Sequence, residues 1–239
     1  MKIALITGSA IRIGRGIAET MLEANYRLIL HAHTSIETLN EWVKKNTRKD
    51  QVIATICADL SSEKGQIEFC QKVQECTDRL HTIVHNASVF KPEVFESISR
   101  ESYRLNQGIN LDAPFFITQS LLPLLRKSEN PSVINIIDAL WSRPRPLFSH
   151  YSVGKAGLAI LTKVLAQELA PKIRVNAIAP GTFLFQPFHS QQTRAQVINK
   201  IPLGKIGTVN EIGKTVLFIS ESLYMTGEII SIDGGRSLV

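Results

Sequence analysis

Cysteine is scarce in this chain of 239 residues, which has only three. They form no CxxC pair and no His/Cys spacing suited to zinc, so we expect no metal site. Cys57 lies in a run that predicts a strand, whereas Cys70 and Cys76 lie in a predicted helix. We interpret all three as buried, small apolar residues in a protein of a reducing compartment.

Long hydrophobic runs are also absent. No segment reaches the roughly 18 consecutive apolar residues of a membrane span. The apolar start at Ile3 turns into a glycine-rich loop too soon for a signal peptide. The basic residues behind the net charge of +6 are scattered, apart from KKNTRK at 44–49, which we interpret as a solvated surface. We expect a soluble, cytoplasmic protein that binds neither membranes nor nucleic acid.

The sequence does contain seven short apolar runs, rich in Ile and Val, that alternate with amphipathic segments. Such runs are typical of parallel strands covered by helices on both faces. They predict an α/β, doubly wound parallel sheet, and because no repeat or linker divides the chain, residues 1–239 should form a single domain. The predicted strands are KIALIT, RLILHA, QVIATIC, HTIVHN, SVINIID, IRVNAIA and EIISID, and the predicted helices span 12–24, 36–46, 62–77, about 98–126, 149–169 and 209–220.

Residues 181–207, between the last two predicted strands, show no regular pattern. Ligands of doubly wound sheets bind at the carboxyl ends of the strands, and this stretch follows such an end. We therefore predict an irregular insertion that acts as a substrate lid. Its residues Phe183, Phe185, Phe188 and His189 would line the substrate entrance.

The first strand runs into the loop TGSAIRIG at 7–14, which opens a helix. Backbone N–H groups at such a helix N-terminus bind a dinucleotide pyrophosphate, and glycines allow its close approach. A tight turn would also use Gly8 and Gly14, but the position after the first strand favours binding. Arg12 stands where a third glycine is usual. It is either a surface residue at the helix start or a cation beside the pyrophosphate or substrate.

The second strand ends in His31-Ala32-His33-Thr34-Ser35, without the carboxylate that commonly binds the ribose 2′-OH of NAD. Hydroxyl and imidazole donors without a repelling carboxylate favour NADPH. A polar loop with a helix cap at Thr34 or Ser35 is the alternative. Asp59, after the third strand, could cap the next helix or accept a hydrogen bond from the adenine amino group.

Tyr151 and Lys155 form the most telling pair, because their i, i+4 spacing at the start of a predicted helix puts phenol and ammonium on one face. A free tyrosine has a pKa of about 10, and a nearby cation favours its ionised form. The pair can therefore transfer a proton while a nicotinamide transfers a hydride. A YxxxK pattern alone is weak, so the argument depends on the residues that accompany it.

These residues occur in a fixed order: the glycine loop, Asp59, the turn His85-Asn86-Ala87-Ser88, Asn110, Tyr151 with Lys155, and Pro180-Gly181. Over the whole chain this set resembles the short-chain dehydrogenase/reductase family. The resemblance implies one Rossmann domain with a seven-stranded parallel sheet and a homotetramer. It implies that Tyr151 donates the proton and that Lys155 binds the nicotinamide ribose and lowers the tyrosine pKa. Asn110, otherwise a mid-helix polar residue, would position a water in a proton relay.

The cofactor-binding residues that this resemblance implies follow the same order. They are Gly8, Arg12, Ile13, Gly14, His33, Thr34, Ser35, Asp59, Leu60, Asn86, Ala87, Ser88, Tyr151, Lys155, Pro180 and Gly181.

Asp138 departs from the family pattern. Thirteen residues before its tyrosine the family normally has a serine, whose hydroxyl stabilises a substrate carbonyl oxygen. An ionised carboxylate would repel the alkoxide that develops on a ketone, so Asp138 suits a substrate that offers N–H donors or needs a proton at a ring nitrogen. The alternative is that Asp138 only ends a strand and caps the next turn.

The same replacement occurs in pteridine reductases and dihydromonapterin reductases, and other segments are similar to that subgroup. Arg12 fits its T-G-x-x-x-R-x-G loop, His33-Thr34-Ser35 is similar to its H-R-S turn, and Asn86 to Phe90 to its N-A-S-x-F. The resemblance implies that Phe90 stacks on the pterin ring and that Ser88 and Arg12 bind the pterin or the phosphates. Thr34 replaces the usual arginine, which weakens the grip on a 2′-phosphate, and His85 receives no role.

These observations predict an NADPH-dependent oxidoreductase that reduces a 7,8-dihydropterin, of the dihydromonapterin, dihydrobiopterin or dihydrofolate type, to the tetrahydropterin. A carbonyl reductase of the oxoacyl or sugar type is the first alternative. A nucleotide-binding sensor without turnover is the second, although such a protein has no need of Tyr151, Lys155 and Asn110 together. The catalytic residues would be Asp138, Tyr151, Lys155 and Asn110, and the substrate-binding residues Arg12, Ser88, Phe90, Asp138 and Tyr151.

Overall fold

Seven parallel strands form one sheet in the computed structural model, which describes residues 1–185 and 190–239. Their order is β3-β2-β1-β4-β5-β6-β7, so the direction of winding reverses between β1 and β4. This is the predicted doubly wound arrangement of a Rossmann fold, and that prediction is confirmed. The strands are β1 (Ile3–Ile6), β2 (Arg27–Ala32), β3 (Val52–Cys57), β4 (Thr82–His85), β5 (Ser132–Ile136), β6 (Arg174–Pro180) and β7 (Ile229–Ile232).

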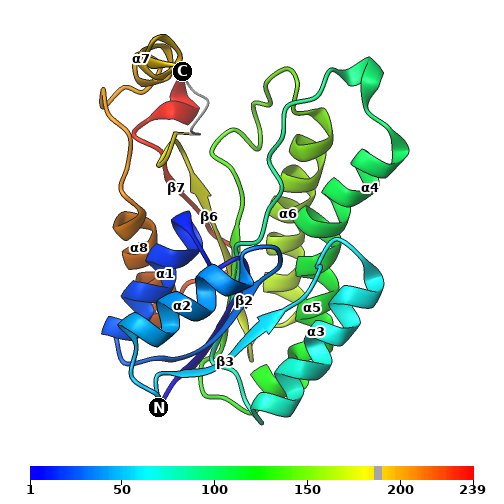
Figure 1. Cartoon of the computed structure of the whole chain (residues 1–239), viewed down its shortest axis with the longest axis vertical. Coiled ribbons are helices and arrows are strands. Elements are labelled where there is room, and N and C mark those ends of the chain that lie inside the picture. Colours follow the sequence, from blue (N-terminus) through cyan, green and yellow to red (C-terminus); the bar gives the residue numbers. More distant parts are fainter. Residues whose placement is uncertain (186–189) are drawn as a thin grey trace.

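Helices cover both faces of the sheet, as Figure 1 shows. One face carries α1 (Arg12–Glu23), α2 (Ile36–Asn46) and α8 (Val209–Glu221), and the other carries α3 (Glu63–Cys76), α4 (Arg100–Gln107), α5 (Ala113–Leu125) and α6 (Ser149–Glu168). Side chains alternate along each strand, so that Leu5 packs into the core beneath α3 and α5, and Ile6 into the core beneath α1 and α8. Burial on both faces explains why most strand residues are apolar.

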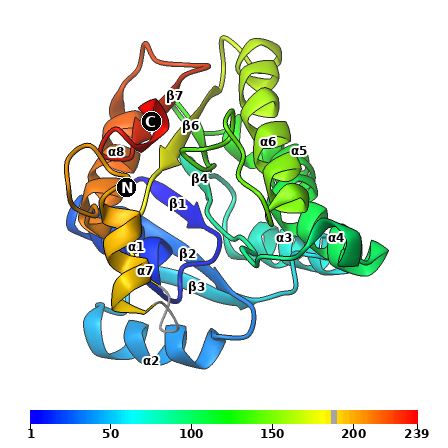
Figure 2. The ribbon, with the colours of Figure 1, turned by 90° about the horizontal axis from the view of Figure 1, so that it is seen from above.

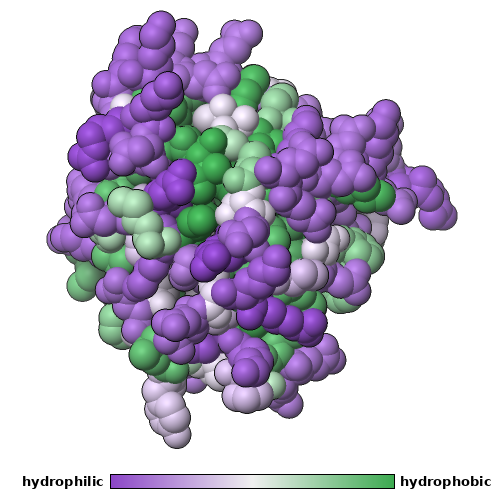
Figure 3. All heavy atoms as spheres, turned by 90° about the horizontal axis from the view of Figure 1, so that it is seen from below, coloured by the Kyte–Doolittle hydropathy of each residue, from purple (hydrophilic) through white to green (hydrophobic). Residues whose placement is uncertain are grey.

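The N-terminus and α7 (Gln191–Ile198) lie at opposite ends of the molecule (Figure 1), and the view from above in Figure 2 shows the strands between the two layers of helices. Because every strand runs parallel to β1, which begins beside the N-terminus, the carboxyl ends of all strands point toward the end that carries α7 and the C-terminus. The opposite end, seen in Figure 3, is mostly hydrophilic, with apolar groups between the polar ones. No helix in the described part of the chain is long and apolar enough to cross a membrane.

The predicted long helix at 98–126 is interrupted. It begins with α4, widens into a π-helical turn over Gly108–Asp112, and continues as α5. Pro114 gives a physical reason, because it has no N–H to donate to the carbonyl of Asn110, four residues earlier. A π turn inside an α-helix often marks a functional site.

Three expectations need correction. The stretch 181–207 is not wholly irregular, because it contains α7, whose N-cap Ser190 accepts a hydrogen bond from the backbone N–H of Thr193. Phe183 does not line an entrance but is buried in the core beneath α1 and α8. Cys57 is exposed, because it ends β3 at the sheet's outer strand, whereas Cys70 is buried as expected. Phe188 and His189 lie outside the described residues.

Helices α1 and α8 approach each other closely, and two glycines make this possible. A Cβ at Gly213 of α8 would collide with Thr20 Oγ1 of α1 and lie 2.9 Å from the Gly16 carbonyl oxygen. A Cβ at Gly16 would lie 2.9 Å from the Val209 side chain. The small residues therefore set the distance between the two helices.

We predict that Gly213→Ala destabilises the protein by about 1–3 kcal/mol, because a tightly packed seam has to open. The sign of this change in stability tests the packing, because helix propensity alone would make the alanine variant more stable by roughly 1 kcal/mol. Urea unfolding measures the effect, with the exposed neighbour Lys214→Ala as the control. An unchanged or higher unfolding midpoint for Gly213→Ala would contradict the packing argument.

Candidate active site

The predicted site residues collect at the carboxyl edge of the sheet, because parallel strands all end there. Six strands each contribute at least one residue at their last position or within the two positions that follow it. In strand order along the chain these are Gly8, His33, Asp59, Asn86, Asp138 and Pro180 with Gly181. Tyr151 and Lys155 join them from the first two turns of α6.

The glycine loop packs directly on the turn that follows β4. Gly8 has a φ of +65°, and a Cβ there would lie 2.8 Å from Ala87 Cα. A Cβ at Gly14 would collide with the carbonyl of Gly8 and lie 2.6 Å from Asn86 Nδ2. That amide instead donates to the carbonyls of Thr7 at 3.0 Å and Gly8 at 2.9 Å. Only glycine at both positions permits this approach.

Helix α1 begins without a side-chain cap. Ile11 occupies the N-cap, and the first turn carries no acidic residue. The first N–H groups of a helix have no partner within it, so an anion is the natural ligand at this end. The donor set therefore fits a dinucleotide pyrophosphate. Arg12 adds an exposed cation with a φ of 57°, and no hydrogen bond or ion pair joins it to another described residue.

Sequence reasoning missed two residues that brace this loop. The hydroxyl of Thr7 accepts hydrogen bonds from the backbone N–H groups of Asn86 and Ala87, both at 3.0 Å. His31 accepts from the Gly8 N–H through Nδ1 at 3.1 Å, and its Nε2 is 3.0 Å from the Ala58 carbonyl. Burial lowers the pKa of His31 to about 4, so the neutral ring can accept and donate. The signal in the sequence was His31 itself, a polar residue inside the otherwise apolar run LILHA, which indicates a buried group with hydrogen-bond partners.

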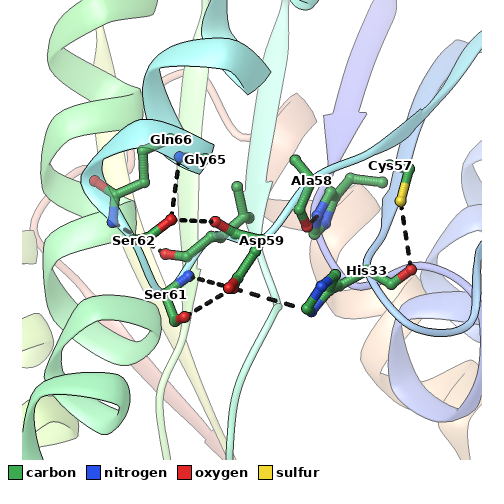
Figure 4. Close-up of polar contacts among 10 residues, drawn as sticks. His33, Cys57, Ala58, Asp59, Ser61, Ser62, Gly65 and Gln66 are labelled. Atoms are coloured by element: carbon green, nitrogen blue, oxygen red, sulfur yellow. Dashed lines mark hydrogen bonds and ion pairs between the residues drawn. The ribbon is translucent and has the colours of Figure 1, made fainter. Parts of the chain in front are cut away.

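The ends of β2 and β3 meet at His33 and Asp59 (Figure 4). Asp59 Oδ1 accepts from the Ser61 N–H at 2.9 Å and its hydroxyl at 2.7 Å, and lies 3.9 Å from His33 Nδ1. Partial burial opposes ionisation of Asp59, but the Ser61 hydrogen bonds outweigh it, so its pKa lies below the usual value. A carboxylate therefore does lie beside the His33 turn, although it comes from the neighbouring strand.

The capping alternative is wrong for Asp59, and Ser35 fulfils it in position only. Ser62, not Asp59, caps α3, because its hydroxyl accepts from the Gly65 N–H at 3.1 Å. Ser35 occupies the N-cap of α2, but its side chain makes no capping hydrogen bond. Leu60, between Asp59 and Ser61, is buried in the core. His33, Ser35 and Asp59 thus keep polar atoms that are not committed to helix capping.

Asp138 contacts the predicted proton donor. The Tyr151 hydroxyl donates to Asp138 Oδ2 at 3.1 Å, while Oδ1 accepts from the Leu140 N–H at 2.7 Å. One carboxylate oxygen thus orders the turn after β5, as the capping alternative predicts, and the other faces the phenol, whereas a role of Asp138 in substrate binding stays a prediction. Burial, the charge of Asp138 and their hydrogen bond all raise the pKa of Tyr151 well above its usual value, and Arg145 opposes this rise.

Lys155 does not lower the pKa of Tyr151 in this geometry, contrary to expectation. Its ammonium donates to the Ile136 carbonyl at 2.7 Å and lies 5.9 Å from the centre of the Tyr151 ring. Burial lowers the pKa of Lys155 to about 8, although Asp138 opposes this shift. The Tyr151 phenol stays protonated because burial and the Asp138 carboxylate raise its pKa more than Arg145 lowers it.

The side chains of Ser88 and Asn110 are used to hold each other. Ser88 donates to Asn110 Oδ1 at 2.7 Å, and Asn110 Nδ2 donates to the carbonyl of Val89 and to Asn106. The main-chain carbonyl of Asn110 has no α-helical donor, because Pro114, four residues later, lacks an N–H.

His85 has a structural role, since it is buried and its Nε2 lies 2.8 Å from the Thr118 hydroxyl.

An aromatic cluster forms the wall beside Tyr151. Phe90, partly exposed, lies edge-to-face on the Tyr151 ring at 4.8 Å and stacks in parallel on Phe148 at 4.4 Å. Sequence reasoning missed Phe148, which had no motif to mark it. The adjoining cleft is small, with a volume of about 10 Å³, and its lining includes Asp138, Leu140, Trp141, Pro144, Arg145, Phe148, Tyr151, Ser152 and Lys155.

Backbone hydrogen bonds fix the carboxyl ends of β5, β6 and β7. The Ala139 N–H donates to the Pro180 carbonyl at 3.0 Å, and the Gly181 N–H donates to the Ile232 carbonyl at 2.9 Å. A Cβ at Gly181 would lie 2.6 Å from Asp233 Cα, so only glycine fits there. Among residues 1–185 and 190–239, no three His, Cys, Asp or Glu side chains form a group that could hold a metal ion.

Comparison with known proteins matches these features to one family. The family model for enoyl-(acyl carrier protein) reductase, a short-chain dehydrogenase/reductase model, matches residues 8–237. A dihydromonapterin reductase from Klebsiella pneumoniae is 32% identical and a 3-oxoacyl-[acyl-carrier-protein] reductase from Thermotoga maritima is 31% identical; each match covers 98% of this chain, and 96% and 97% of the respective relative.

A solved structure extends the similarity to the fold and to a bound cofactor. The alternative dihydrofolate reductase FolM from Brucella canis, in complex with NADP, is 27% identical and superposes with a TM-score of 0.92. The match covers 100% of this chain and 94% of that one. The chain thus has the fold of nicotinamide-dependent reductases along its whole length.

We predict that Lys155→Met abolishes turnover yet raises stability at pH 7. Burial lowers the pKa of Lys155 from 10.5 to about 8, so below pH 8 the folded state holds a charge that the unfolded state solvates better. This penalty is about 3 kcal/mol, partly offset by the lost bond to Ile136, and it shrinks as the pH rises above 8. Urea unfolding between pH 6 and 10 measures the difference.

The control is Lys163→Met, an exposed lysine of the same helix, whose effect should not vary over that pH range. A variant at Lys155 that is less stable than the wild type at pH 7, or whose stability difference is independent of pH, would contradict the prediction.

Proposed function

The chain belongs to the short-chain dehydrogenase/reductase family, and from this premise we propose that it is an NADPH-dependent reductase of 7,8-dihydropterins. The observation that carries the proposal is the hydrogen bond of 3.1 Å from the Tyr151 hydroxyl to the Asp138 carboxylate, beside the partly exposed ring of Phe90. A proton donor, a carboxylate acceptor and an aromatic surface meet in one cleft.

A ketone substrate fits this arrangement poorly. Its reduction places negative charge on the carbonyl oxygen, and an ionised Asp138 beside Tyr151 would repel that charge. The amino-pyrimidinone edge of a pterin instead presents N–H donors, which a carboxylate accepts. The Asp138 carboxylate therefore favours a flat, nitrogen-rich ring over a carbonyl.

Phe90 supplies the stacking surface, as the family resemblance implies. Phe148 already covers one face of its ring, so the substrate takes the other face or displaces Phe148. Ser88 is held by Asn110 and therefore positions the turn, whereas the exposed Arg12 is available to the pyrophosphate or the pterin.

The reaction needs a hydride at C6 of the dihydropterin ring and a proton at N5. The nicotinamide, when bound, supplies the hydride. Tyr151 supplies the proton, and its raised pKa keeps the phenol protonated at neutral pH, as a donor must be. Asp138 or Arg12 could deliver the proton through water instead. The free main-chain carbonyl at Asn110 suits a water that restores the proton, and Lys155 suits the nicotinamide ribose.

The cofactor site supports a dinucleotide with a 2′-phosphate. The glycine loop and the uncapped start of α1 suit the pyrophosphate, and His33, Thr34 and Ser35 offer donors at the end of β2. Asp59 beside His33 works against a second negative charge, so we expect a moderate rather than strict preference for NADPH over NADH. Asp59 and Leu60 would lie beside the adenine, and Ile13, Asn86, Ala87, Pro180 and Gly181 would line the rest of the cofactor cleft.

A carbonyl reductase is the second candidate, because the 3-oxoacyl-[acyl-carrier-protein] reductase from Thermotoga maritima is as similar as the pterin-reducing relative, at 31% against 32% identity. The two candidates differ at Asp138. The segment 181–207, with α7 in it, is proposed as the lid for either substrate.

The deciding experiment is a substrate panel. The purified protein is incubated with NADPH or NADH and with 7,8-dihydropterins, dihydrofolate or ketones, and loss of the reduced-nicotinamide absorbance is followed. We expect oxidation with at least one dihydropterin. Failure with every pterin would overturn the proposal, and activity on 3-oxoacyl substrates alone would establish the second candidate.

The variant Asp138→Ser sharpens this result. We expect pterin turnover to fall at least 100-fold, because the acceptor for the ring donors is lost, which corresponds to about 3 kcal/mol or more of transition-state stabilisation. Activity on ketones should stay unchanged or rise. Retained pterin turnover in this variant would show that Asp138 does not select the substrate.

We also propose a homotetramer, because α5 and α6 expose large apolar side chains to solvent in the single chain. They are Phe115, Phe116, Val153, Ile160 and Val164. Several large apolar side chains exposed on two helices are typical of an interface between subunits. Analytical ultracentrifugation should find a tetramer, and Ile160→Glu should shift it to smaller species, whereas a monomeric wild type would contradict the proposal.

A further inference from the structure

Arg145 lies on the loop between β5 and α6, at the mouth of the active-site cleft. Its guanidinium carbon is 4.7 Å from the centre of the Phe148 ring and 5.1 Å from that of Phe90, and the two rings are 4.4 Å apart. Since these three distances are nearly equal, the guanidinium sits beside the stacked pair and not between its rings. Cation–π contacts at an exposed site hold a side chain in place without neutralising its charge.

The charge of Arg145 has no counterpart in the described part of the chain. No carboxylate pairs with it and no acceptor takes a hydrogen bond from its five N–H groups. Asp138, which lines the same cleft, accepts hydrogen bonds from the Leu140 N–H and the Tyr151 hydroxyl and none from Arg145, and each of its oxygens can accept one more. Arg143, two residues earlier, differs because its Nη1 donates to the Ser237 carbonyl at 3.0 Å.

One cleft thus presents a carboxylate that accepts and a guanidinium that donates. A ring whose N–H edge binds Asp138 satisfies the first group but leaves the second without a partner. A planar fork of N–H donors is best matched by a carboxylate or a phosphate, which accept two hydrogen bonds and a charge together. A substrate with both an N–H edge and an anionic substituent satisfies the whole cleft.

We propose that Arg145 is a specificity-determining residue that selects substrates with an anionic side chain, a carboxylate or a phosphate, over neutral analogues. The inference rests on the proposed function, because it takes Tyr151 and Asp138 to act on the ring of such a substrate. Arg145 itself acts on the side chain of the substrate and so affects mainly its binding.

The test compares two matched pairs of dihydropterins. The carboxylate arm uses 7,8-dihydrofolate and its analogue with both carboxylates converted to amides. The phosphate arm uses 7,8-dihydroneopterin and its monophosphate. For each ligand, KM and kcat are measured with NADPH, and the dissociation constant is measured separately with NADP⁺ from quenching of Trp141, which lines the cleft. A Trp42→Phe background removes the other tryptophan.

In the wild type we expect at least one anionic ligand to bind about 10-fold more tightly than its neutral partner, an effect that weakens at high salt. Arg145→Gln should abolish this ratio, mainly through KM, and Arg145→Lys should retain part of it. Arg143→Gln removes the same charge from the same loop and should retain the ratio in full. The arm that shows the preference identifies the anion.

Equal affinities within both pairs, or a preference that Arg145→Gln leaves intact, would overturn the inference. If the wild type still reduces neutral dihydropterins in that case, the proposed function stands without it. If no dihydropterin, charged or neutral, is bound or reduced, both the proposed function and the role of Arg145 are wrong.

Discussion

The parallel alignment of the strands is the constraint on which the rest of the structure depends. A sheet buried on both faces admits almost only apolar side chains along its strands, so chemistry is confined to the strand ends. Because all strands point the same way, their carboxyl ends meet at one edge, and residues far apart in the sequence become neighbours there. The winding of the sheet reverses between β1 and β4, and there the Asn86 amide donates hydrogen bonds to the carbonyls of Thr7 and Gly8, which hold the loops after the two strands together. A dinucleotide site at that edge follows from topology before any side chain is chosen.

Burial then decides the protonation states at this edge. Tyr151 is placed beside a carboxylate, and the cation on the next turn of α6 donates to the Ile136 carbonyl, so the phenol keeps its proton. This suits the reducing direction, in which the tyrosine gives up a proton, better than the oxidising direction, in which it must accept one. The same burial makes Lys155 costly to the fold, because a charged amine is removed from water. A residue that weakens the fold and serves the site is typical of catalytic positions.

The sequence predicted the sheet, most helix boundaries and the strand-end residues, because each depends on local periodicity or on a short motif. It did not predict the bracing by His31 or the stacking of Phe148 on Phe90, because such contacts join segments distant in sequence and carry no motif. It placed Lys155 on the same face of α6 as Tyr151 but wrongly expected it to lower the tyrosine pKa. The i, i+4 spacing shows which side chains share a helix face, and it does not reveal that Asp138 contacts the phenol and raises its pKa. The helix α7 was missed because its eight residues, QQTRAQVI, lack an amphipathic pattern.

In the proposed function, Asp138 and Arg145 together determine which substrates the cleft binds. Each influences Tyr151, because the carboxylate raises the pKa of the phenol and the guanidinium opposes that rise. A neutral ketone would use neither group fully, and a neutral ring would use only the carboxylate. The glycine loop and the Tyr151–Lys155 pair would serve any substrate of a nicotinamide-dependent reductase, whereas these two charges are proposed to restrict the choice. In the proposed function, the residues that select the substrate are therefore ones that the hydride transfer itself does not require.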